Sequence, residues 1–166
     1  MDPQQIAVIF DMDGVLVDSA AAHMESWTVL SRELAAPPIT PGQFSSAFGR
    51  RSTDIICDWY GVSDPAEALR LEHRKEAVYR DLIRGRVPAM PGAVELVIRL
   101  HTAGFKLAVG SSGPPDNVAL VCREMKLDDW MQALVTGADV QRGKPDPQVF
   151  LIAAQRLNSA PSQCVV

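Results

Sequence analysis

Two aspartates stand directly after a short apolar run near the N-terminus. Residues 6–10 read I-A-V-I-F, and Asp11 and Asp13 follow at once, separated by Met12. Like charges this close repel each other, so a positive group is expected beside them. A turn or a helix cap would not explain two acids at one strand end. The pair therefore indicates a site that binds a cation.

Two later segments carry groups that bind anions. Residues 109–113 read V-G-S-S-G, where Ser111 and Ser112 offer hydroxyl and main-chain N–H groups ahead of a predicted helix. Lys144, in the sequence G-K-P-D-P, adds an ammonium group. A carboxylate can attack phosphorus, and a hard divalent cation and a lysine can neutralise the charge that gathers there. Together these residues predict phosphoryl transfer, with Mg²⁺ as the cofactor.

The elements that carry these residues follow a regular alternation. Helical periodicity fills the intervals between four short apolar runs typical of buried strands: Ile6–Phe10, Lys106–Val109, Ala133–Val135 and Cys164–Val166. This alternation predicts an α/β fold with a Rossmann-like parallel sheet, whose ligands bind beyond the carboxyl ends of the strands. The aspartates, the serines and the lysine would meet at that edge.

One long stretch interrupts the alternation. Residues 19–90 contain no convincing strand, and their apolar spacing predicts four helices, near residues 19–35, 41–47, 52–60 and 65–84. We therefore predict an α/β core, made of residues 1–16 and 91–166, with an all-helical cap inserted at residues 17–90.

Several helix starts are marked by capping residues. Thr40 and Asp64 are each followed three residues later by Gln43 or Glu67, which is the capping-box pattern. Ser19 is expected to cap the first helix of the insertion.

The motifs and their order resemble the haloacid dehalogenase superfamily. The resemblance rests on D-M-D-G-V-L-V-D-S at residues 11–19, on the serine of V-G-S-S-G and on the lysine of G-K-P-D-P, and it covers nearly the whole chain. It implies that Asp11 is the nucleophile and that Asp13 is the general acid and base. It also implies that Asp11 and the main-chain carbonyl of Asp13 bind Mg²⁺, and that Ser111 and Lys144 hold the phosphoryl group.

The helical insertion resembles the cap of the subgroup that contains β-phosphoglucomutase and phosphoglycolate phosphatase. By that resemblance His23 and Lys75 lie near the acid/base, although a surface histidine and a solvated lysine are the simpler interpretation of each residue. One of Arg50 and Arg51, in F-G-R-R-S, would bind the distal part of a phosphorylated substrate, and the other would be solvated.

The family has a fourth, acidic motif, which the resemblance places after the strand that begins at Cys164. Because Val166 is the last residue, we expect the C-terminal part of the core to be missing and one metal ligand to be absent. We also expect the first strand to be left with an unpaired apolar edge.

Composition limits the remaining possibilities. A net charge of −4 gives no reason to expect nucleic acid as a partner, and no apolar stretch is long enough to predict a membrane span. The three cysteines show no metal or disulfide spacing. We expect a cytoplasmic monomer whose partner is a small phosphorylated metabolite.

Three functions remain open at this point. The chain could be a phosphatase of a sugar phosphate, a β-phosphoglucomutase-type phosphomutase, or an inactive fragment or binding module that lacks the fourth motif. A phospho-accepting signalling domain is disfavoured, because its acceptor aspartate would follow a later strand and it would carry no helical insertion.

Overall fold

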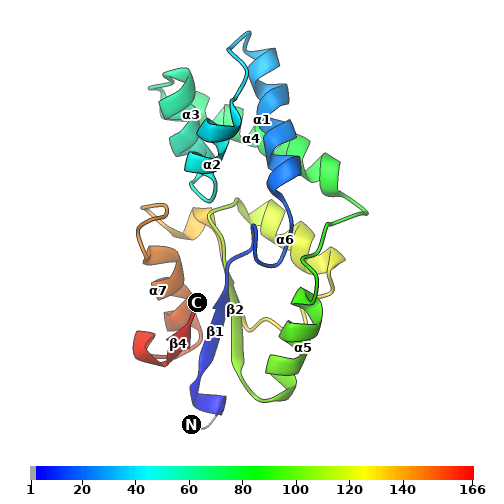
Figure 1. Cartoon of the computed structure of the whole chain (residues 1–166). Helices are drawn as coiled ribbons and strands as arrows, with labels where there is room; N and C mark the ends of the chain where they lie inside the picture. The colour runs from blue at the N-terminus through cyan, green and yellow to red at the C-terminus, as the bar shows by residue number, and fades with distance from the viewer. Residues whose placement is uncertain (1–2) are drawn as a thin grey trace.

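The fold was analysed in a computed structural model, which describes residues 3–166 (Figure 1). Three short 3₁₀ helices, η1 (Pro3–Gln5), η2 (Gly137–Asp139) and η3 (Pro161–Gln163), accompany the strands and α-helices. In chain order, these strands and α-helices are β1 (Ala7–Phe10), α1 (Ala20–Glu33), α2 (Pro41–Ala47), α3 (Ser52–Tyr60), α4 (Pro65–Ile83), α5 (Ala93–Thr102), β2 (Lys106–Gly110), α6 (Pro115–Glu124), β3 (Ala133–Val135), α7 (Gln148–Arg156) and β4 (Cys164–Val165).

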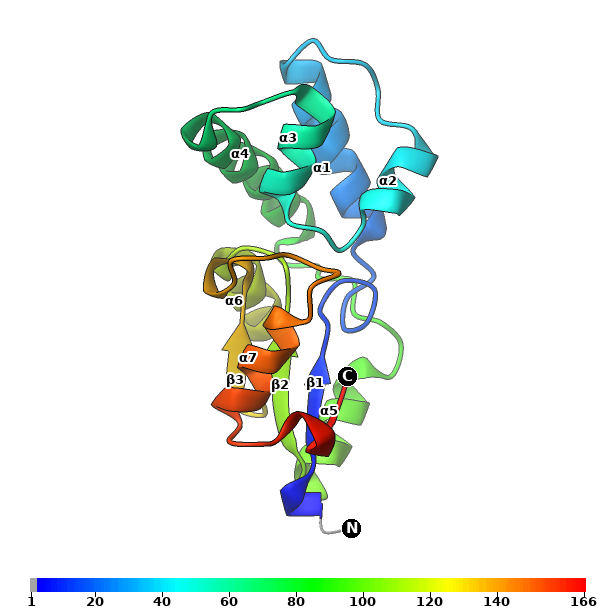
Figure 2. The same ribbon diagram turned by 90° about the vertical axis from the view of Figure 1, so that its left-hand side faces the viewer.

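The strands form one parallel sheet in the order β3-β2-β1-β4. Helix α7 covers one face of the sheet, and α5 and α6 cover the other (Figures 1 and 2). Successive side chains of a strand point to opposite faces, so Ile9 packs into the cluster that includes α7, whereas Phe10 packs into the cluster that includes α5 and α6. The predicted α/β fold with a parallel sheet is confirmed.

The short β4 changes the expected environment of β1. Cys164 and Val165 pair with Ala7 and Val8, so the first half of β1 lies inside the sheet. The predicted unpaired edge of β1 is therefore wrong for Ala7 and Val8.

Helices α1 to α4 pack on one another beyond the carboxyl ends of the strands (Figures 1 and 2). Their bounds agree with the predicted helices to within two residues. They enclose an apolar cluster of their own, which includes Trp27, Leu30 and Ile56. This cluster gives the four helices a buried interior separate from the two that flank the sheet.

The capping predictions are only partly confirmed. Thr40 and Gln43 form the reciprocal capping box at the start of α2. The side chain of Asp64 accepts a hydrogen bond from the N–H of Ala66, but Glu67 pairs with Arg70 and so does not close a box.

The prediction that Ser19 caps α1 with its side chain is wrong. Its hydroxyl donates to Oδ1 of Asp13 at 2.7 Å instead. The residue at the start of α1 therefore serves the aspartate pair and leaves the helix end uncapped by a side chain.

Among the residues described, no helix combines the length and the apolar character that crossing a membrane requires.

Candidate active site

A tight turn after β1 places both aspartates at the carboxyl end of the sheet. The main-chain N–H groups of Leu16 and Val17 donate to the carbonyl of Met12, and Gly14 has a φ of 79°, in the region that favours glycine. Met12 is 1% exposed and packs into the core between the aspartates. Both Asp11 and Asp13 border the same pocket.

Asp11 is paired with the lysine that follows the third strand. Its Oδ2 lies 2.6 Å from Nζ of Lys144, and its Oδ1 accepts a hydrogen bond from the N–H of Met12 at 2.7 Å. Burial raises the pKa of Asp11, and the ammonium of Lys144 opposes that rise without cancelling it. Asp11 is thus a poorly solvated carboxyl group held in a fixed orientation at the mouth of the pocket.

Asp13 has different partners and an opposite shift. Its Oδ1 accepts from the Ser19 hydroxyl and lies 3.1 Å from Nε2 of His23. Burial favours the neutral acid, but His23 and Ser19 outweigh burial and lower the pKa of Asp13. The two neighbouring carboxyl groups are therefore chemically distinct, and Asp13 is the stronger acid of the two in the free protein.

His23 connects Asp13 to a buried lysine. Nδ1 of His23 lies 2.7 Å from Nζ of Lys75, whose side chain is 1% exposed, and the imidazole stacks on Tyr79 with ring centroids 4.0 Å apart. The simpler interpretation of Lys75 as a solvated surface residue is therefore wrong. Lys75 also contacts the carboxylate of Glu76, at 2.9 Å.

The two serines lie differently from each other. Ser112 borders the pocket, whereas Ser111 is fully buried and its hydroxyl accepts a hydrogen bond from the N–H of Gly113 at 3.0 Å. The structure brings Ser112, and not Ser111, to the pocket wall beside Asp11. The role of Ser111 in holding a phosphoryl group stays a prediction.

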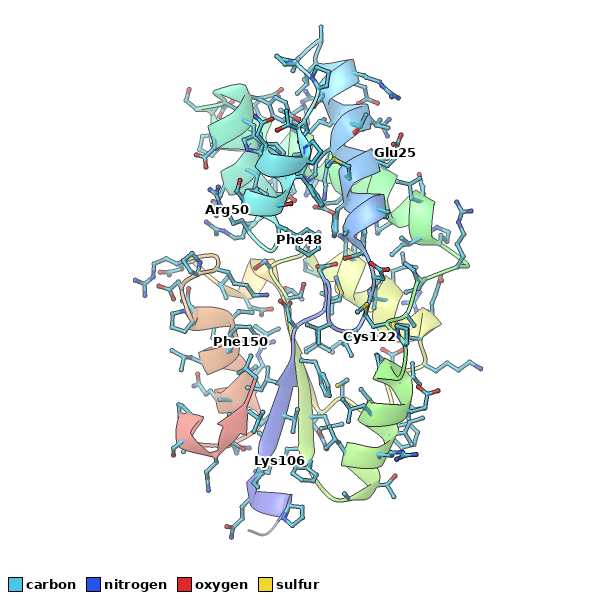
Figure 3. All side chains as sticks on the ribbon, viewed as in Figure 1. Glu25, Phe48, Arg50, Lys106, Cys122 and Phe150 are labelled. Atoms are coloured by element: carbon cyan, nitrogen blue, oxygen red, sulfur yellow. The ribbon has the colours of Figure 1, made fainter. Side chains whose placement is uncertain are left out.

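The two arginines of the α2–α3 loop have different surroundings. Arg50 borders the pocket and pairs with Asp58, whereas Arg51 pairs with Asp54. The side chain of Arg51 lies against Gly143, where an added Cβ would come within 2.9 Å of Cγ of Arg51. Figure 3 labels Arg50 and Phe48 at the edge of the helical part that faces the strand ends.

The pocket lies between the strand ends and helices α1 to α4 and opens to solvent. Its sheet side is polar, because the aspartates, Ser112 and Lys144 line it. Its opposite side mixes apolar and polar residues, and is formed by Trp27, Phe44, Ala47, Phe48, Ile55 and Trp59 together with His23, Arg50, Ser52, Lys75 and Glu76. Such a pocket suits a small molecule with an anionic end.

Some residues around the site were not predicted from the sequence. Ser19, Glu76 and Tyr79 each contact a group of the site directly. A signal for Glu76 was present, because Lys75 and Glu76 fall on the same helical face as the buried residues Leu71 and Tyr79. A charged pair on an apolar face implies buried partners.

The donor atoms of the site suit a hard cation only in part. Asp11 offers a carboxylate and Asp13 a main-chain carbonyl, and these oxygens are the ligand type that Mg²⁺ prefers. Within residues 3–166, no group of three or more acidic, histidine or cysteine side chains is placed to hold a metal ion. This set fits a cation that keeps several waters and takes further oxygens from a phosphate.

Comparisons with known proteins find similar sequences among phosphatases and a phosphomutase. The chain is 30% identical to a phosphorylated carbohydrates phosphatase of Thermotoga maritima, with 96% of this chain and 74% of that protein covered. It is 33% identical to hexitol phosphatase A of Escherichia coli (95% and 71% covered) and 30% identical to a β-phosphoglucomutase of Bacillus subtilis (95% and 72% covered).

Solved structures give the same answer for the fold. A hydrolase from Pseudomonas syringae superimposes with a TM-score of 0.85 at 29% identity, covering 96% of this chain and 74% of that one. The family model described as haloacid dehalogenase-like hydrolase matches residues 7–166. With nearly every residue matched, and with Asp11 and Lys144 in contact at a pocket that Asp13 also borders, this chain belongs to the haloacid dehalogenase-like hydrolase family.

Proposed function

We propose that this protein hydrolyses a small phosphorylated metabolite, a sugar phosphate, through an aspartyl-phosphate on Asp11. The observation that carries the proposal is the 2.6 Å contact between Asp11 and Lys144 in a pocket that also contains Asp13. It supplies a carboxylate nucleophile, an ammonium group for the phosphoryl oxygens, and a second carboxyl group with a different pKa.

The residues divide the reaction into two displacements. An oxygen of Asp11 attacks phosphorus, the bond to the sugar oxygen breaks, and Asp13 gives that oxygen a proton. Asp13 then takes a proton from water, whose oxygen attacks phosphorus and releases Asp11 and inorganic phosphate. Lys144 and the Ser112 loop face the phosphoryl oxygens throughout.

Asp13 must be protonated before the first displacement, although its pKa is lowered in the free protein. A phosphate dianion that enters beside Asp13 favours the protonated form, because like charges repel. Substrate binding therefore prepares the acid.

Mg²⁺ belongs to this proposal as the cofactor. Asp11 and the main-chain carbonyl of Asp13 would hold it, and when bound it neutralises charge on the phosphoryl group. The residues 17–90 that carry His23 and Lys75 would act as a cap that excludes water from the pocket.

We place the protein in the cytoplasm, because its cysteines are unpaired.

A β-phosphoglucomutase-type reaction is the second candidate. It is favoured by the contacts of His23 with Asp13 and Lys75 and by the similarity to the Bacillus subtilis mutase. In that reaction a sugar hydroxyl would replace water as the acceptor, and every residue named above would keep its role.

The direct test is phosphate release from a panel of sugar phosphates, beside isomerisation of β-glucose 1-phosphate. Hydrolysis should exceed isomerisation, and Asp11→Asn should abolish both, by about 10⁴-fold or more, because the amide is not a nucleophile. Asp129→Asn, an exposed position, is the matched control. Activity retained in Asp11→Asn would refute the mechanism, and isomerisation faster than release would replace the phosphatase by the mutase.

The cofactor is tested by removing divalent ions. Phosphate release should stop in EDTA and return when Mg²⁺ is added in excess, because a phosphate dianion beside two carboxylates needs a cation. Undiminished release in EDTA would contradict the assignment of Mg²⁺.

The two neighbouring arginines give a test of substrate contact. Arg50→Ala should raise KM about tenfold, the loss expected for one charge-assisted hydrogen bond. Arg51→Ala should change KM less, because Arg51 packs on Gly143 and does not border the pocket. Arg70→Ala, on the exposed side of α4, serves as the control. A larger effect of Arg51 on KM would contradict the placement of Arg50 at the substrate.

A further inference from the structure

A buried chain of polar contacts extends from the site into the interface between the helical part and the sheet. Glu76 is 2% exposed, and its Oε1 accepts from Nζ of Lys75 at 2.9 Å and from the hydroxyl of Ser52 at 2.5 Å. Its Oε2 accepts from Nδ2 of Asn117 at 2.7 Å. Every partner of this carboxylate is a donor, so the arrangement suits an ionised Glu76.

Asn117 belongs to the other side of the interface. It lies in the first turn of α6, the helix that follows the Ser111–Gly113 loop, and it is fully buried. Its Oδ1 accepts from Nη1 of Arg80 at 2.9 Å while its Nδ2 donates to Glu76. With a donor on one side and an acceptor on the other, its amide has one favourable orientation.

These contacts determine which ring nitrogen of His23 carries the proton. An ammonium can only donate, so Lys75 requires Nδ1 of His23 to be an acceptor. A neutral imidazole then carries its proton on Nε2, which faces Asp13 at 3.1 Å. The stacking of Tyr79, at 4° between ring planes, holds the imidazole in that orientation.

We propose that Glu76 and Asn117 are positioning residues for Asp13, which act through Lys75 and His23. They couple the orientation of Asp13 to the packing of helices α1 to α4 against α6. The proposal rests on the proposed role of Asp13. Glu76 accepts from Nζ of Lys75 and so holds it against Nδ1 of His23, and Asn117 holds Glu76 in place from the sheet side. The bonds of Glu76 and Arg80 to Asn117 both join α4 to α6, so both are lost when helices α1 to α4 move away from α6.

Glu76→Gln should disturb this arrangement without changing the size of the side chain. A buried ammonium without a counter-charge favours the neutral amine, which can accept a hydrogen bond. His23 could then carry its proton on Nδ1, and Nε2 would no longer donate to Asp13. Glu67→Gln is the matched control, since Glu67 lies on the exposed side of the same helix.

The first readout is the tautomer of His23, measured by nitrogen-15 NMR of the imidazole groups and assigned with His23→Ala. The Nε2-protonated form should dominate in the unaltered protein and in Glu67→Gln, and the Nδ1-protonated form should gain population in Glu76→Gln. This measurement needs no activity.

The second readout compares two leaving groups. A sugar phosphate needs a proton on its leaving oxygen, whereas p-nitrophenyl phosphate does not. Glu76→Gln should lower kcat/KM for the sugar phosphate about tenfold or more and should leave kcat/KM for p-nitrophenyl phosphate nearly unchanged, since acid catalysis contributes about 10²-fold or more in such reactions. The ratio kcat/KM reports the first displacement and excludes the later hydrolysis, in which Asp13 acts as a base for both substrates. Asn117→Ala should shift the same ratio in the same direction by a smaller factor.

The outcomes separate this proposal from the proposed function. An unchanged His23 tautomer in Glu76→Gln and Asn117→Ala, or an equal loss of kcat/KM on both substrates, would overturn the positioning role. If Glu76→Gln does not fold, as judged by circular dichroism, Asn117→Ala decides by the same readouts. If the unaltered protein hydrolyses neither substrate, the proposed function fails, while the tautomer still decides the role of Glu76 and Asn117.

Discussion

Asp11 and Asp13 lie two residues apart at the end of β1, and each needs its own stabilising partners because their charges repel. Lys144 reaches Asp11 from the loop after β3, whereas Ser19 and His23 reach Asp13 from the start of the helical insertion. The pKa of Asp11 is raised and that of Asp13 is lowered. Two carboxyl groups of one turn can therefore take different roles in one reaction.

This division of partners explains why the site needs both parts of the structure. The parallel sheet brings the ends of β1, β2 and β3 to one edge, which places Asp11, Ser112 and Lys144 together. The helical part adds His23, Lys75 and the aromatic side of the pocket. Neither part alone lines the whole pocket, and the buried Glu76 joins the two through Asn117.

Much of this arrangement follows from the sequence, because it depends on local patterns. The apolar run before Asp11 predicts β1, and the order of aspartate, serine and lysine predicts the contacts at the strand ends. The orientation of Ser111 could not be predicted, because it depends on a hydrogen bond with Gly113 inside the turn. Ser19 fits a helix cap equally well by sequence, and only the position of Asp13 decides which partner it takes.

Most of the contacts that the sequence did not predict join residues that lie far apart in the chain. Glu76 meets Asn117 across 41 positions, and Lys75 meets His23 across 52. Arg50 and Arg51 are neighbours in the sequence, yet Arg50 borders the pocket and Arg51 packs against Gly143. Sequence spacing shows that such residues are unusual for their helix face, whereas tertiary packing determines what they contact.

The central claim is that Asp11 carries the phosphoryl group during turnover. The most direct measurement is to quench the protein rapidly in acid during the reaction with a sugar phosphate, reduce any acyl phosphate with borohydride, and locate the reduced residue by mass spectrometry. The account predicts a homoserine at position 11 and an unmodified Asp13. Reduction at position 13, or phosphate release with neither residue modified at any quench time, would contradict it.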